Sequence, residues 1–217
     1  MSLKLSGPKL LPEKCNISNI VLFLHGYGAN GNDLISLSSF WKDILPETAF
    51  YSPNAPFSTD FGPDSYQWFD LLKRTKDEMK DGLAKSGPYL NNYIEEILNE
   101  NNLDIHKLLV VGFSQGTIMA LDHMSKRSSP CAGVIGYSGM FFEDEDCQKN
   151  IQCTFPILLC HGKNDEVIPY ESSNIATKTL NNLGFSVKCN ILDDLGHGIN
   201  EKGLLIGKKF IKSVLGV

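Results

Sequence analysis

Six short apolar runs alternate along the chain with segments of helical spacing, and this alternation constrains the fold more than any other feature. Several runs are apolar at successive residues, as expected for strands that are covered on both faces. The strands are predicted at IVLFLH (20–25), AFYSP (49–53), KLLVVGF (107–113), AGVIGYS (132–138), PILLCHG (156–162) and VKCNILDD (187–194). The helices are predicted at 88–102, 114–127, 170–184 and 198–215. Strands separated by helices indicate the α/β class, with a mostly parallel central sheet and helices on both faces.

The length of 217 residues suits a single domain spanning 1–217. Apolar residues make up 42% of the chain and charged residues 21%, which is enough to bury a core of ordinary size. The stretch 54–87 has no clear period and is long for a connection between two elements. Because such stretches are often functional, we expect it to form part of a binding site.

Charge and cysteine content exclude several classes of protein. The net charge of -5 argues against a nucleic-acid partner, which normally requires a basic face. No apolar run approaches the roughly 20 residues that span a bilayer, so stable membrane insertion is not expected. The N-terminal stretch lacks the features of a secretory signal, and the six cysteines contain no CxxC pair. Reduced thiols in the cytoplasm are the simplest expectation, although cysteine usage alone does not exclude a disulfide. The sequence is compatible with a monomer and with a homodimer.

The pentapeptide GFSQG (112–116) lies where a predicted buried strand turns into a predicted helix. A Gly-x-Ser-x-Gly turn at this point exposes the serine oxygen at the end of a sheet, and the glycines leave the space that side chains would fill. The helix that begins there directs its free N–H groups at developing negative charge. The alternative is a tight turn that contains a serine by chance. The position between strand and helix favours Ser114 as a nucleophile.

A serine hydroxyl needs a base to accept its proton and a third group to orient that base. In hydrolases of this kind, the chain order is serine, acid, histidine, each at the end of a strand. Asp165 follows the strand at 156–162 directly and leads into VIP, so it is preferred as the acid. Its competitors are Glu166, Asp193 and Asp194, which are more typical of solvated loop carboxylates.

Five histidines compete for the role of base. His25 and His161 each precede a glycine at a strand end, His106 precedes a strand, and His123 lies within a predicted helix. A lone histidine is more often structural than catalytic. His197 is the one in a glycine-flanked loop between the last strand and the last helix, so it is predicted to be the base.

Hydrolysis of an acyl group also requires donors for the oxyanion. One expected donor is the backbone N–H of Gln115, directly after the nucleophile. The second should come from the loop after an early strand, here LHGYGANG (24–31), and we assign it to the backbone N–H of Tyr27. The alternative for this loop is a tight turn without a catalytic role.

With these pieces placed, the chain resembles the phospholipase/carboxylesterase family of α/β-hydrolases, which includes bacterial carboxylesterases and acyl-protein thioesterases. The resemblance runs from about residue 20 to the last helix, through LFLHGYGANG, PNAP (53–56), QWFD (67–70), GFSQG, HGKNDEVIP and the late GHG. It implies the α/β-hydrolase fold and the hydrolysis of carboxylic esters or thioesters without metal or cofactor. It also implies Ser114 as nucleophile, Asp165 as orienting acid and His197 as base.

The resemblance extends to the acyl-binding region. Trp68 and Phe69 match a WFD segment near that region, although the residues alone fit core aromatics equally well. We expect the aromatic residues of 54–87, including Phe57 and Phe61, to form a wall for the acyl group. The family often has leucine where Tyr27 stands, which leaves the preferred acyl chain length open.

Two other functions are considered. A dienelactone-hydrolase-like enzyme is disfavoured because that group carries cysteine where this chain has Ser114. A non-catalytic binding module on the same fold is also conceivable, since a fold does not prove an activity. Such a module would lack a member of the triad, and this sequence supplies all three.

Overall fold

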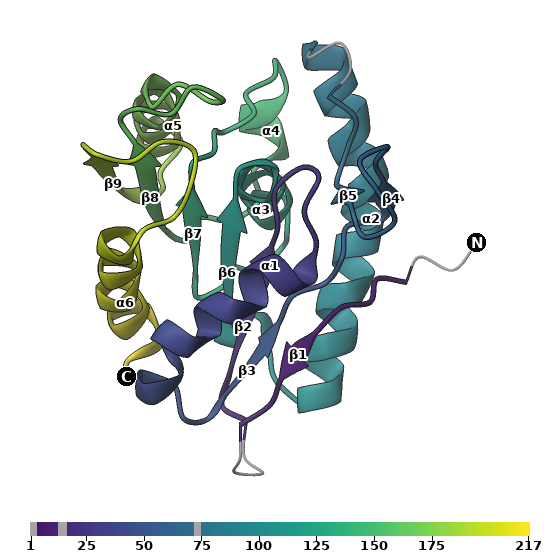
Figure 1. The fold of residues 1–217 in the computed structure, drawn as a ribbon, viewed down its shortest axis with the longest axis vertical. Coiled ribbons are helices and arrows are strands. Elements are labelled where there is room, and N and C mark those ends of the chain that lie inside the picture. Colours follow the sequence, from purple (N-terminus) through teal and green to yellow (C-terminus); the bar gives the residue numbers. More distant parts are fainter. Residues whose placement is uncertain (1–3, 13–16, 72–74) are drawn as a thin grey trace.

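The computed structural model describes residues 4–12, 17–71 and 75–217, so Cys15 lies outside the described residues. A seven-stranded sheet forms the centre of the molecule, in the order β1-β3-β2-β6-β7-β8-β9 (Figure 1). Its strands are β1 (Lys9–Leu10), β2 (Asn19–Leu24), β3 (Thr48–Tyr51), β6 (Leu108–Phe113), β7 (Gly133–Tyr137), β8 (Pro156–Gly162) and β9 (Ser186–Leu192). All neighbours pair in parallel except β1, which runs antiparallel to β3 at the edge. The six predicted strands are therefore confirmed to within two residues at each end, whereas β1 was not predicted.

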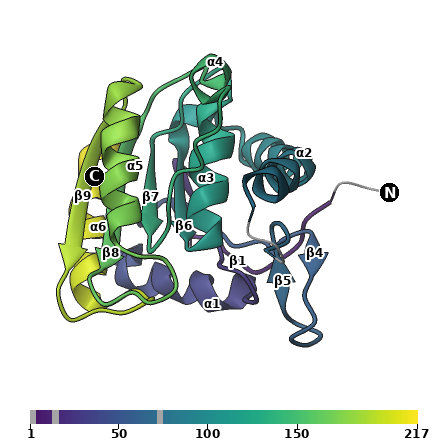
Figure 2. The same ribbon diagram turned by 90° about the horizontal axis from the view of Figure 1, so that it is seen from above.

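Helices cover both faces of the sheet, as predicted (Figures 1 and 2). They are α1 (Gly31–Ile35), α2 (Lys76–Asn101), α3 (Gln115–Ser125), α4 (Cys147–Asn150), α5 (Glu171–Asn182) and α6 (Glu201–Leu215), with short 3-10 turns at 36–40, 42–44 and 105–107. Successive residues of β2 face opposite sides: Leu22 joins the apolar core beneath α2, α3 and α5, and Val21 and Phe23 join the core beneath α1 and α6. This two-sided burial explains why the strand is apolar at every position from Ile20 to Leu24. In the described part of the chain, no helix is both long and apolar enough to span a bilayer.

The start predicted for the second helix was wrong. The helix was predicted at 88–102 because its apolar residues recur at helical spacing, but α2 begins at Lys76 and contains Pro88 in its interior. Thr75 caps the helix by accepting a hydrogen bond from the Glu78 N–H, and Asp77 and Glu78 place negative charge in the first turn. The stretch 54–87 therefore holds the first turns of α2 and, before them, a small hairpin of β4 (Phe57–Ser58) and β5 (Tyr66–Gln67) that lies beside α2 (Figure 2).

The strand order places a candidate site between β2 and β6. The chain runs from β2 outward to β3 and then returns past β2 to β6, so the order reverses between these two neighbours. In open parallel sheets, ligands bind at such a reversal, outside the carboxyl ends of the strands. The loop after β2 and the turn after β6, which carries Ser114, meet at this point.

Candidate active site

Ser114 occupies a strained turn between β6 and α3. Its φ of 51° and ψ of -115° lie in a region that non-glycine residues rarely adopt. The turn is held because the N–H of Ser114 donates to the carbonyl of Tyr137 on β7, at 2.9 Å. Strain of this kind persists only where the surroundings enforce it, and it concentrates at functional sites.

The two glycines of the pentapeptide are required because other backbone atoms lie too close to leave room for a side chain. A Cβ on Gly112 would lie 2.5 Å from the N atom of Thr117, and a Cβ on Gly116 would lie 1.9 Å from the carbonyl oxygen of Leu24. Real Cβ atoms do not approach other atoms so closely. The glycines therefore let α3 begin directly against the ends of β6 and β2, which fixes the position of Ser114.

Thr117 directly follows the second glycine of the pentapeptide, and its side chain is buried. Its hydroxyl donates to the carbonyl of Tyr137 at 3.1 Å. Cβ atoms on Gly136 and Gly139 would lie 2.5 Å and 2.3 Å from Thr117 side-chain atoms. These two glycines make room for the larger side chain without moving the turn.

Asp165 and His197 are brought together by the loops after β8 and β9. The Asp165 Oδ2 lies 2.7 Å from the His197 Nδ1, while its Oδ1 accepts the N–H groups of Val167 and Ile168, each at 2.9 Å. Burial raises the pKa of Asp165. Hydrogen bonds from the Ile168 N–H, from His197 and from the Val167 N–H outweigh burial and leave this pKa below its ordinary value. An ionised Asp165 holds the proton of His197 on Nδ1, so Nε2 has the lone pair that a base needs.

His197 lies beside the serine turn. Its ring packs against Phe113, the residue before Ser114, with ring centroids 5.0 Å apart. The side chain of His197 keeps 19% of its surface exposed, whereas the side chain of Asp165 is fully buried. The three residues predicted from chain order thus converge on one edge of the sheet.

The loop after β2 borders the same point. A Cβ on Gly26 would lie 3.3 Å from the Cβ of Ser114, so the backbone next to Tyr27 is adjacent to the nucleophile position. The N–H of Gly28 donates to the carbonyl of Tyr66, and the N–H of Tyr66 donates to the carbonyl of Ala29, both at 2.9 Å. Strand β5 therefore ties down the loop in which an oxyanion donor was predicted.

Gln115 contributes a side-chain contact that sequence reasoning missed. Its amide oxygen accepts the N–H of Trp68 at 2.8 Å, and its amide nitrogen donates to the carbonyl of Phe69 at 2.7 Å. Gln115 itself is buried. The residue after the nucleophile thus fastens the 67–70 segment to the serine turn. No local pattern predicts this contact, because its partners lie 47 and 46 residues away in the sequence.

The three predicted substrate contacts differ in exposure. Trp68 and Phe69 are buried, and the Trp68 indole N–H donates to the carbonyl of His25 at 3.0 Å. Phe57 is half-buried and meets the ring of Tyr89 edge to face, with centroids 5.9 Å apart. Burial favours the interpretation of Trp68 as a core aromatic. Phe57 is the better placed of the three to meet a ligand.

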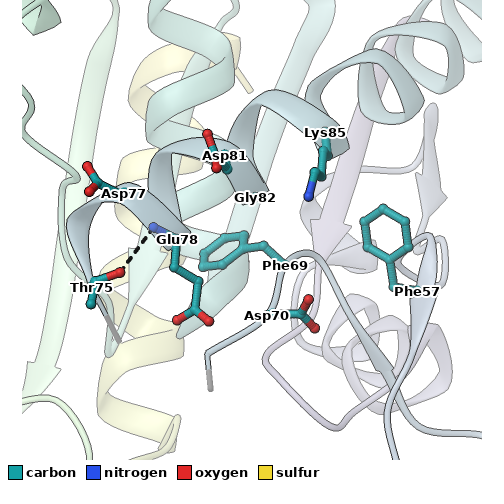
Figure 3. A pocket seen from close by; sticks show the side chains of 9 residues that line it. All are labelled: Phe57, Phe69, Asp70, Thr75, Asp77, Glu78, Asp81, Gly82 and Lys85. Atoms are coloured by element: carbon teal, nitrogen blue, oxygen red, sulfur yellow. Dashed lines mark hydrogen bonds between the residues drawn. The ribbon is translucent and has the colours of Figure 1, made fainter. Parts of the chain in front are cut away.

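Two cavities lie near these residues. The larger, of about 670 Å³, is lined by Phe57, Phe69, Asp70, Thr75, Asp77, Glu78, Asp81, Gly82 and Lys85 (Figure 3). Its lining is rich in charged side chains and contains none of Ser114, Asp165 and His197. The smaller, of about 280 Å³, is lined by His25, Gly26, Ala29, Asp33, Leu34, Leu37, Phe113 and Ile199. We favour the smaller cavity as part of the site because Gly26 and Phe113 adjoin Ser114.

Among the described residues, the buried neighbours of the site include two histidines that had been considered as bases. His25 directly follows β2, and His161 lies at the end of β8. Both have no exposed surface. The ring of His25 contacts the backbone of Gly26 and Ala55, and the ring of His161 contacts Asp165. The sequence had drawn attention to both histidines through the His-Gly pairs at the strand ends. Their contacts with the Gly26 backbone and with Asp165 were not predicted.

The fold and the arrangement of these residues define an α/β-hydrolase, and comparison with known proteins agrees. The model of the Phospholipase/Carboxylesterase family matches residues 8–215. The chain is 28% identical to acyl-protein thioesterase 1 of Candida albicans over 90% of this chain and 91% of that protein. It is 23% identical to Esterase YpfH of Escherichia coli over 85% of this chain and 78% of that protein. The crystal structure of esterase PE8 superposes with a TM-score of 0.92 at 34% identity, covering 97% of this chain and 99% of that one.

The chain therefore belongs to the phospholipase/carboxylesterase family. It is an enzyme of the hydrolase class, as its sequence predicted, and esters or thioesters are the substrates that fit this class.

Proposed function

We propose that this chain is a single catalytic domain that cleaves carboxylic esters, and thioesters as well, through an acyl-enzyme on Ser114. The observation that carries the proposal is the 2.7 Å hydrogen bond between Asp165 and His197, formed beside a serine held in a strained turn. A nucleophile, a base and an orienting acid on loops of separate strands are the elements of acyl transfer.

In the proposed reaction, the Ser114 hydroxyl attacks the acyl carbonyl while His197 takes its proton on Nε2. Asp165 stabilises the imidazolium that forms. His197 then gives the proton to the departing alcohol or thiol, which leaves the acyl group on Ser114. A water molecule deprotonated by His197 attacks this ester, and the acid departs as Ser114 regains its proton.

The oxyanion in both halves of the reaction is held by the backbone N–H groups of Tyr27 and Gln115. Gln115 is the first residue of α3, so its N–H is one of the groups left without an intrahelical acceptor. Tyr27 follows Gly26, whose backbone adjoins the Cβ of Ser114. Removal of one donor of this kind typically costs about 10²–10³-fold in turnover.

The acyl group is placed against the hairpin of β4 and β5. Phe61, between these strands, is 74% exposed, and its ring meets that of Tyr27 edge to face with centroids 5.7 Å apart. Phe57 lies at the base of the same hairpin. Large aromatic rings next to an oxyanion donor give an apolar surface on which acyl chains of several lengths can lie.

We place the enzyme in the cytoplasm and consider both alcohols and thiols as leaving groups. The cysteines at 131, 147, 153, 160 and 189 are free thiols, which suits the reducing cytoplasm. The reaction as written needs no metal and no cofactor, and it can be carried out by a monomer or by each subunit of a homodimer. Several relatives are named acyl-protein thioesterase and others esterase, so both leaving-group classes enter the test.

The test is hydrolysis of p-nitrophenyl esters from acetyl to palmitoyl and of the matching acyl thioesters, with Ser114→Ala in parallel. We expect turnover by the native protein and a loss of at least about 10⁴-fold in Ser114→Ala. A fluorophosphonate probe should label the native protein and not the variant. Ser125→Ala, at the far end of α3, is the control and should keep both properties. The same ester series on Phe61→Ala tests whether the acyl chain lies against the hairpin of β4 and β5. If it does, the preference for acyl chain length should change in this variant.

A folded native protein that neither turns over any ester or thioester nor takes up the probe would contradict the proposal. That result would favour the non-catalytic binding module. Turnover that survives in Ser114→Ala would place the nucleophile elsewhere.

A further inference from the structure

His25 cannot serve as the base, because backbone groups occupy both of its ring nitrogens. The N–H of Ala55 donates to Nε2 at 2.9 Å, and Nδ1 lies 2.7 Å from the carbonyl oxygen of Gly26. The side chain has no exposed surface, and its ring packs on the indole of Trp68 with centroids 5.8 Å apart. The imidazole is therefore held in one position by the backbone of Gly26 and Ala55 and by the indole of Trp68.

The two partners of His25 also determine where its proton sits. A backbone N–H can only donate, so Nε2 must offer its lone pair to Ala55. A neutral imidazole then carries its proton on Nδ1, which donates it to the carbonyl of Gly26. Burial lowers the pKa of His25, against the opposing effects of the hydrogen bond to Gly26 and the charge of Asp33, so the ring stays neutral.

The Gly26 carbonyl has a direct connection to catalysis. It shares one planar peptide unit with the N–H of Tyr27, so an orientation imposed on the carbonyl is imposed on that N–H as well. In a trans peptide, the two groups point in opposite directions. The carbonyl is held by Nδ1 of His25 and by the N–H of Ala29, at 3.3 Å. A Cβ on Gly26 would lie 3.3 Å from the Cβ of Ser114, so this peptide adjoins the nucleophile.

We propose that His25 is a positioning residue, whose Nδ1–H fixes the Gly26–Tyr27 peptide so that the Tyr27 N–H is directed at the oxyanion. The inference rests on the proposed function, in which Tyr27 supplies one of the two oxyanion donors. A preoriented donor stabilises the transition state more than the bound substrate, because it needs no reorganisation as charge develops. Loss of the orientation should therefore lower kcat and leave KM almost unchanged.

The test compares two amides that each keep one half of the imidazole. In His25→Asn the amide nitrogen takes the place of Nδ1 and can donate to Gly26. In His25→Gln the amide oxygen takes the place of Nε2 and can accept from Ala55, but the donor to Gly26 is lost. We expect His25→Gln to lower kcat about 10–100-fold with KM within about 3-fold, and His25→Asn to recover most of that loss. The affinity of a trifluoromethyl ketone, which forms an oxyanion adduct with the serine, should fall in parallel with kcat/KM across the variants.

Equal turnover in the two amide variants, or melting temperatures that fall while kcat holds, would overturn the proposal and leave His25 with a structural role. If either variant fails to fold, the tautomer of His25 in the native protein decides, measured from its ¹⁵N shifts. A proton on Nε2 or a charged ring would overturn the proposal, and a proton on Nδ1 supports it. An inactive native protein that no fluorophosphonate labels is a failure of the proposed function instead, and in that case the tautomer is still measurable.

Discussion

At the scale of single residues, Asp165 shows how a buried carboxylate is kept ionised. Its Oδ1 accepts two backbone N–H groups, and its Oδ2 lies 2.7 Å from His197 and 3.0 Å from the Nε2 of His161. Four donors match the four lone-pair positions of a carboxylate. The Nε2 of His161 also lies 2.9 Å from the carbonyl oxygen of Ile168, and its Nδ1 lies 2.6 Å from the hydroxyl of Ser173. Because Nε2 faces two acceptors, it carries the proton.

We expect His161 to hold Asp165 in the orientation that His197 requires. In His161→Gln the amide nitrogen can reach the position of Nε2 and keep the donor to Asp165, whereas in His161→Asn it cannot. Loss of kcat/KM should be about 10-fold or more for His161→Asn and clearly smaller for His161→Gln. Steady-state kinetics on one ester, with melting curves for both variants, checks this. Equal losses in the two variants would reduce His161 to a packing residue.

At the scale of elements, the sequence was most informative where one local rule decides the structure. Strands buried on both faces are largely apolar, and this rule predicted five of the six strands closely; the sixth, β9, lies at the sheet edge, is partly exposed and contains Lys188 and Asn190. The order of Ser114, Asp165 and His197 along the chain likewise predicted which loops converge. The start of α2 was mispredicted because apolar residues recur at helical spacing only from residue 88 onward, while the cap at Thr75 lies 13 positions earlier in a segment without clear periodicity. The roles of His25, His161 and the Gln115 side chain depend on partners distant in sequence, which no local pattern encodes.

Helix α6 offers a matched pair of glycines on one element. A Cβ on Gly203 would meet its nearest neighbours at 3.4 Å, an ordinary contact, whereas a Cβ on Gly207 would lie 2.5 Å from the hydroxyl oxygen of Tyr137. Because alanine is the better helix former, we expect Gly203→Ala to raise the free energy of unfolding by about 0.5 kcal/mol. Gly207→Ala should lower it by about 1–3 kcal/mol, because the added methyl overpacks the core. Urea unfolding of both variants measures the difference, and effects of the same sign would contradict this account of the packing between α6 and β7.

At the scale of the whole molecule, the interface between α2 and α3 should set the response to acid. A Cβ on Gly87 of α2 would lie 3.7 Å from the Nδ1 of His123 on α3, so this side chain faces α2. Its Nε2 is buried without a hydrogen-bond partner among the described residues. Burial, with the nearby charges of Arg127 and Lys126, lowers the pKa of His123 to about 3. On the α2 side, the lining of the adjoining cavity includes Glu95, which is already paired with Arg127. The folded chain therefore keeps this ring neutral over a pH range in which the unfolded chain protonates it.

The sign of the effect follows from proton linkage. The pKa of His123 is depressed on folding, so its contribution to stability is present above the ordinary value of 6.5 and is lost progressively as the pH falls toward about 3. The slope is at most about 1.4 kcal/mol per pH unit, so the native protein should lose up to about 2 kcal/mol between pH 7 and pH 5 from this group alone. In His123→Gln that part of the loss should disappear, while His106→Gln, at an exposed position, should retain it. Chemical unfolding at the two pH values provides the measurement, and an unchanged loss in His123→Gln would contradict the assignment.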